Sequence, residues 1–163
     1  MILNGRNEEV LNRALDELKS EESDVAGLAG DIQEEQTFQE LIKLAIKEFG
    51  KIDIWINNAG IGAHETIEQM TEEVFDRLFN IHFKGVYFLT QKAIPFLNDN
   101  GRIINISSGL ARFTLPGYSA YASMMVVDHL LPRPGGGEAP VARQLRFDDH
   151  VQGAIFVHPW QRR

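Results

Sequence analysis

The sequence predicts an α/β fold, namely a partial doubly wound parallel sheet with helices on both faces. Three observations predict it. Short apolar segments alternate with longer segments of helical periodicity along residues 1–125. The apolar segments are hydrophobic throughout, as expected when both faces of a parallel sheet are covered. Polar or glycine-containing clusters follow the ends of these segments, where ligands bind in such sheets.

Four apolar segments are expected to be strands, because each is short and bounded by turn residues. They cover residues 1–4, 24–32, 52–56 and 102–106. The second strand is expected to end at Asp31. The sequence Asn98-Asp99-Asn100-Gly101 predicts a turn before the fourth strand.

Helices are expected between these strands, where apolar residues recur every three or four positions. They cover about 7–19, 34–49, 71–97 and a segment that begins near Tyr118. Asn7 and Thr71 are predicted N-caps, each followed by two glutamates that favour the positive end of the helix dipole. Gly50 lies where a left-handed C-terminal cap belongs, and Pro95 is expected to bend the third helix.

The composition excludes several kinds of protein. The net charge is -7, with 23 acidic against 16 basic residues, and an acidic chain repels the phosphates of nucleic acids. There is no cysteine, and the histidines show no metal-ligand spacing, so we expect neither disulfides nor a metal site. No apolar run approaches the roughly 20 residues that span a bilayer. We therefore expect a soluble, cytoplasmic chain without nucleic-acid or membrane partners.

Three clusters at strand ends are candidates for the functional site. They are Asp31 after the second strand, Asn57-Asn58-Ala59-Gly60 after the third, and Ser107-Ser108 after the fourth, with Tyr121 downstream in the sequence PGYSAYAS. With these clusters in this order, residues 1–125 resemble an incomplete member of the short-chain dehydrogenase/reductase family. The resemblance implies a partial Rossmann-like dinucleotide-binding domain over 1–125, which transfers hydride between NADP(H) and a carbonyl or alcohol.

The resemblance implies catalytic roles for Ser108, Tyr121 and His82. Ser108 matches the serine that orients the substrate oxygen, and Tyr121 matches the acid–base tyrosine. A carbonyl that gains a hydride becomes an oxyanion and needs a proton, which a phenol can supply while a hydroxyl holds the oxygen. His82 takes the position of a family asparagine. It can still hydrogen-bond a water, and an ordinary helix histidine is the alternative.

The resemblance also assigns cofactor-binding residues, namely Arg6, Asp31, Asn58, Ala59 and Gly60. Arg6 matches the loop that contacts the adenine ribose. An arginine there, without an acidic residue at the strand end, indicates NADP(H) rather than NAD(H). An ordinary surface arginine is the alternative for Arg6. Asp31 matches the acidic residue near the adenine, and the other three match the loop beside the cofactor.

Two departures from the family predict impaired activity. Met125 replaces the lysine four residues after the tyrosine, and methionine carries no charge to lower a phenol pKa of about 10. The first strand and its glycine-rich phosphate turn are expected to be absent, because residues 1–4 match the second strand. That first strand is central in the order 3-2-1-4-5-6. Its loss is expected to separate two strand pairs, or to require another segment between them.

Residues 126–163 are predicted to be a divergent, poorly patterned tail. Only 154–157 has the pattern of a short strand, and a reading-frame change would produce such an abrupt loss of pattern. Three functions stay open at this point. The chain is an impaired oxidoreductase with a small carbonyl or alcohol substrate, an inactive fragment, or a non-enzymatic partner. The last would form a homo-oligomer through helices 71–97 and 118–131.

Overall fold

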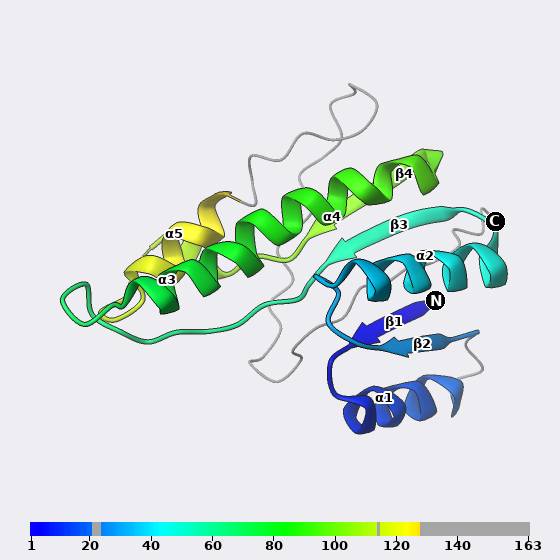
Figure 1. Cartoon of the computed structure of the whole chain (residues 1–163), viewed down its shortest axis with the longest axis horizontal. Helices are drawn as coiled ribbons and strands as arrows, with labels where there is room; N and C mark the ends of the chain where they lie inside the picture. The colour runs from blue at the N-terminus through cyan, green and yellow to red at the C-terminus, as the bar shows by residue number, and fades with distance from the viewer. Residues whose placement is uncertain (21–23, 114, 128–163) are drawn as a thin grey trace.

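The structure is a computed structural model that describes residues 1–20, 24–113 and 115–127 (Figure 1). Its strands are β1 (Ile2–Gly5), β2 (Ala26–Ala29), β3 (Ile52–Asn57) and β4 (Leu97–Asn105). Its α-helices are α1 (Glu8–Ser20), α2 (Glu35–Phe49), α3 (Glu72–Phe79), α4 (Val86–Ala93) and α5 (Ser119–Val127). The alternation of strand and helix confirms the predicted α/β class.

The strands form two parallel pairs, β1 with β2 and β3 with β4. Within the described residues, the two pairs share no hydrogen-bond ladder, as expected if a central strand does not lie between them. A common core still joins the pairs, because Ile2 of β1 and Trp55 of β3 belong to one buried cluster. Phe38 and Leu41 of α2 lie in the same cluster, so α2 packs against both pairs.

Helices α1 and α2 cover opposite faces of the first strand pair (Figure 1). Ile2 packs in the cluster that contains the α2 residues, whereas Leu3 packs against Leu11 and Leu15 of α1. Successive side chains of a strand point to opposite faces, so this alternation places one helix on each side. The prediction of helices on both faces is confirmed for this pair.

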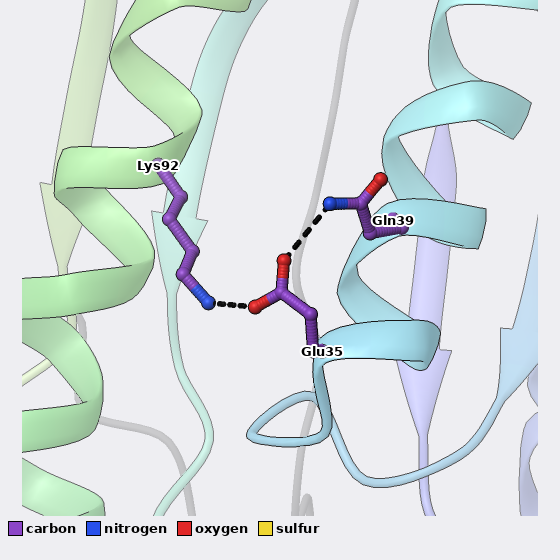
Figure 2. Close-up of polar contacts among 3 residues, drawn as sticks. All are labelled: Glu35, Gln39 and Lys92. Carbon is purple, nitrogen blue, oxygen red and sulfur yellow. Dashed lines mark hydrogen bonds and ion pairs between the residues drawn. The ribbon is translucent and has the colours of Figure 1, made fainter.

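A polar contact between α2 and α4 also links the two strand pairs (Figure 2). The Glu35 carboxylate accepts hydrogen bonds from Gln39 Nε2, at 2.9 Å, and from the ammonium of Lys92. Both contacts lower the pKa of Glu35, the Gln39 bond most. Lys92 Nζ also lies 5.5 Å from the centre of the Phe38 ring. The contact is exposed, so packing rather than this ion pair supplies most of the linkage.

The predicted N-caps are present. The Asn7 side-chain oxygen accepts from the N–H of Val10 at 3.0 Å, and Thr71 Oγ1 accepts from the N–H of Val74 at 3.3 Å. Gly50 ends α2 with a φ of +82°, which favours glycine, but its ψ of -92° lies outside the left-handed helical region that was predicted. These local signals therefore set the helix ends where the sequence predicts them.

The helix predicted over 71–97 is present but shorter, because helical residues run without a break from Glu72 to Ala93. A π-helical segment, Asn80–Gly85, separates α3 from α4 and contains His82. Pro95 does not bend a continuing helix, because it lies in a short 3-10 turn after α4 has ended. π-helical segments are rare and often occur at functional sites.

The turn residues predicted at Asn98–Gly101 do not precede the strand but lie inside β4. Ile52 pairs with Leu97, but Ile54 pairs with Arg102, so the residues between form an irregularity in the strand. Turn residues are tolerated there because a bulge needs no regular pairing.

Some predictions lie outside the described residues. These are the end of the last helix beyond Val127, the strand at 154–157 and nearly all of the tail over 126–163. The first two tail residues continue α5, so the pattern extends slightly past the predicted boundary at 125. Among the described residues, no helix has the length and apolarity needed to cross a membrane.

Candidate active site

A buried polar network fixes the end of β3. The amide nitrogen of Asn57 donates to Thr90 Oγ1 at 2.9 Å and to Asn105 Oδ1 at 2.8 Å. Its side-chain oxygen accepts from the indole N–H of Trp55 at 2.8 Å. A buried amide is costly unless it is paired, so these bonds hold β3 against α4 and β4. They thereby set the direction of the loop that follows.

Four of the five predicted cofactor residues line one pocket at the carboxyl ends of β1, β2 and β3. These are Arg6, Asp31, Ala59 and Gly60; Asn58 is not among the lining residues. An adjacent pocket shares Ala59 and reaches Asn57. Asp31 lies two residues beyond the end of β2, where its carboxylate accepts from the N–H of Gln33 at 3.0 Å. The structure thus brings most of the predicted cofactor site together.

Asn4 belongs to the same pocket and was not predicted. Its side chain is buried, and its amide nitrogen donates to the carbonyl oxygens of Leu28, at 2.9 Å, and Gly30, at 3.2 Å. These bonds join the carboxyl ends of β1 and β2. The available signal was a polar residue inside an otherwise apolar strand.

His82 holds the loop that follows β3. Its side chain is 6% exposed, and Nε2 lies 2.7 Å from the carbonyl oxygen and 3.1 Å from the nitrogen of Ile61. Depending on the tautomer, this nitrogen either donates to the carbonyl or accepts from the N–H. A Cβ atom at Gly60 would lie 2.8 Å from His82 Cε1, so the close approach requires glycine.

Burial lowers the pKa of His82 from about 6.5, and the hydrogen bond with Ile61 only partly opposes this effect. The imidazole is therefore neutral at pH 7. Its ring meets the Tyr121 ring edge-on, with centroids 5.4 Å apart and an interplanar angle of 90°. Two predicted catalytic residues from distant parts of the chain are thus in contact.

The two serines after β4 make different contacts. Ser108 Oγ accepts from the N–H of Leu110 at 3.2 Å and begins a short 3-10 turn, Gly109–Ala111. Ser107 Oγ donates to the carbonyl oxygen of Met125 at 2.9 Å and so ties β4 to α5. Ala111 and Tyr121 pack against the same buried cluster, which places the turn that Ser108 begins beside α5.

Met125, at the position of the family lysine, is a core residue. Its side chain is 2% exposed and packs with Leu78 of α3 and with Ala120 and Met124 of α5. The position therefore belongs to the packing between these two helices. No charge is available there to act on Tyr121.

Comparison with known proteins agrees with this geometry. The family model for short chain dehydrogenases matches residues 1–125. The chain is 36% identical over 124 residues to a short-chain dehydrogenase/reductase of Pestalotiopsis microspora. This match covers 75% of this chain and 47% of that protein. The chain is also 31% identical over 115 residues to the versicolorin reductase of Emericella nidulans. This second match covers 70% of this chain and 44% of that protein.

A solved structure shows the same arrangement. The promiscuous reductase LugOII, which catalyses keto-reduction at C1 during lugdunomycin biosynthesis, matches with a TM-score of 0.72 at 25% identity. The match covers 79% of this chain and 55% of LugOII. The chain spans about half the length of the curated relatives it matches. From the match over residues 1–125 and the strand-end residues that it includes, this chain belongs to the short-chain dehydrogenase/reductase family.

Proposed function

We propose that this chain carries the cofactor and catalytic residues of an oxidoreductase that transfers hydride between NADP(H) and a carbonyl or alcohol. One observation carries the proposal. The pocket lined by Arg6 and Asp31 includes Gly60 and Ile61, and His82 contacts both of these residues as well as Tyr121. The His82 ring thus lies between the residues of the nucleotide pocket and the proposed proton donor. When bound, the nicotinamide supplies or accepts the hydride.

The residues of the pocket suit the adenosine end of NADP(H). Arg6 is exposed, and its guanidinium can pair with a 2′-phosphate. Asp31 offers carboxylate oxygens that can accept from the adenine amino group. No acidic residue stands at the end of β1, where one would favour NAD(H), and the Asn4 amide is already bonded to β2. The family generally uses NAD(P), and this donor set favours the phosphorylated form.

Tyr121 and Ser108 are the proposed catalytic residues. In the reductive direction, the phenol of Tyr121 gives its proton to the substrate oxygen as the carbonyl becomes an alcohol. The Ser108 hydroxyl donates a hydrogen bond to the same oxygen while negative charge develops on it. The N–H of Leu110 donates to Ser108 Oγ and holds this side chain at the start of the 3-10 turn beside α5.

His82 is proposed as a positioning residue, because a neutral imidazole supplies no positive charge to Tyr121. It holds the ring of Tyr121 and the Gly60–Ile61 loop in a fixed relation. Met125 supplies no charge either. We therefore propose that activity is impaired at neutral pH, because neither side chain supplies the positive charge that would lower the pKa of a phenol.

Calorimetric titration of the full chain with NADPH, and with NADH for comparison, tests the proposal. We expect saturable NADPH binding with a Kd below about one millimolar, and weaker binding of NADH. Absence of binding by both nucleotides would overturn the proposal and favour an inactive chain. Tighter binding of NADH would overturn the assignment of Arg6.

A second candidate function is self-association through α3, α4 and α5. Apolar side chains of these helices remain exposed, and exposed apolar patches often mark interaction sites. The residues are Phe75, Phe79, Tyr87, Phe88 and Val126. We propose that a second copy of this chain covers them. Light scattering on the wild type and on Phe75→Ser tests this, with Val10→Ser, an exposed apolar position on α1, as the control. A monomeric wild type would exclude the role.

A further inference from the structure

Four aromatic rings form a row from the surface to the buried part of the candidate site. The centroid of His64 lies 4.9 Å from that of Tyr118, and Tyr118 lies 6.4 Å from Tyr121. Tyr121 in turn lies 5.4 Å from His82. His64 is exposed and His82 is buried, so the row leads from solvent to the proposed proton donor.

Backbone contacts fix the outer two rings. The N–H of Glu65 donates to the carbonyl oxygen of Gly117 at 2.8 Å, which joins the loop after β3 to the loop before α5. Gly117 has a φ of +82°, and a Cβ atom there would lie 2.6 Å from His64 Nε2. Glycine therefore lets the His64 ring lie directly against the backbone. The N–H of Tyr118 donates to the carbonyl oxygen of Leu115 at 3.1 Å.

The loop that leads to Tyr118 also exposes apolar side chains. Phe113 and Leu115 expose 55% and 48% of their surfaces. Exposed apolar side chains cost solvation in the free protein. A bound molecule with an apolar, planar body would cover them.

We propose that Tyr118 and His64 are specificity-determining residues that select a planar aromatic ketone as the substrate. This inference rests on the proposed function, because it takes Tyr121 as the proton donor. A carbonyl oxygen within reach of Tyr121 places the body of the substrate along Tyr118, with His64 farther out. Aromatic pairs attract one another beyond the effect of buried area, whereas a saturated ring gains only the burial.

Two ketones with the same carbon skeleton test the inference. β-Tetralone is aromatic and β-decalone is saturated, and their binding to the full chain is measured by NMR titration with and without NADPH. We expect β-tetralone to bind about threefold to tenfold more tightly, the range typical of an aromatic pair. Equal affinities, or no binding of either ketone, would overturn the inference.

Variants locate the preference. Tyr118→Leu is expected to remove it and Tyr118→Phe to retain it, while Phe96→Leu, an exposed ring in the 3-10 turn after α4, serves as the control. His64→Leu is expected to reduce the preference. Because His64 is exposed, this variant should fold and can still test the inference if Tyr118→Leu does not fold. A preference that survives both leucine variants would contradict the assignment.

A separate assay of NADPH consumption distinguishes failure of the aromatic preference from failure of the proposed oxidoreductase activity. Preferential binding of β-tetralone without ketone-dependent NADPH consumption would support the aromatic site and contradict the proposed oxidoreductase. Consumption at equal rates with both ketones, together with equal affinities, would support the oxidoreductase and overturn the aromatic preference.

Discussion

The imidazole Nε2 of His82 lies 2.7 Å from the carbonyl oxygen of Ile61. This contact joins the π-helical segment between α3 and α4 to the loop that follows β3. The same ring touches Tyr121, so one buried histidine connects the nucleotide pocket with the proposed proton donor. The contact also makes the fold sensitive to the charge of the imidazole.

We expect the stability of the chain to fall in mild acid because of His82. Its pKa is lowered in the folded state by burial, so below about pH 6.5 the unfolded chain takes up a proton that the folded chain resists. The stabilisation is present above that pH and is lost as the pH falls toward the lowered pKa. Urea unfolding across this range measures it. His82→Asn should remove this part of the pH dependence. An unchanged pH profile in His82→Asn would contradict the assignment.

Gly60→Ala is expected to displace the His82 ring, because the new Cβ would lie 2.8 Å from His82 Cε1. The ring is buried and has little space to move, so we expect a loss of roughly 1–3 kcal/mol of stability. Gly62→Ala is a matched control two residues away, where a Cβ would meet nothing within 4 Å. Thermal unfolding compares the two variants. Equal melting temperatures would show that the contact does not constrain the loop.

The strands and helix caps of the first half were predictable because their signals are local. Thr71 and Gly50 act through hydrogen bonds and backbone angles of their own segments. The meeting of Arg6, Asp31 and Gly60 was predictable as well, because parallel strands end at the same edge of the fold.

The errors occur where tertiary contacts override local preference. The sequence of Asn80–Gly85 is compatible with an α-helix, and the interruption coincides with the contact between His82 and Ile61. Asn98–Gly101 are turn residues, which lie within a strand only because β4 pairs with β3 on both sides of them. Asn4 was missed because its partners are backbone carbonyls of another strand.

Arg6→Ala is expected to weaken NADPH binding about tenfold or more while leaving NADH binding nearly unchanged. The physical reason is the loss of a charge-assisted hydrogen bond to the 2′-phosphate, which NADH lacks. Arg13→Ala is the matched control, because Arg13 is an exposed arginine on α1 outside the pocket. Calorimetry with both nucleotides provides the measurement. If Arg6→Ala weakened both nucleotides equally, Arg6 would contribute only general electrostatic attraction.

Met125→Lys restores the family lysine, yet we expect it to destabilise the chain rather than to repair it. Met125 is 2% exposed and packs against Leu78, so an ammonium group there would be removed from water without a partner among its packing neighbours. The expected loss is on the order of 3 kcal/mol, less if the lysine becomes neutral.

Urea unfolding of Met125→Lys and of Met125→Leu separates the effect of charge from that of shape, because leucine keeps the apolar volume. Met125→Leu should unfold nearly as the wild type does, and Met125→Lys should unfold at a lower urea concentration. The loss should shrink as the pH rises toward the lysine pKa of about 10.4, where the neutral amine is buried at less cost. A stable Met125→Lys variant with increased NADPH-dependent turnover would show instead that α5 can turn this side chain toward the active site.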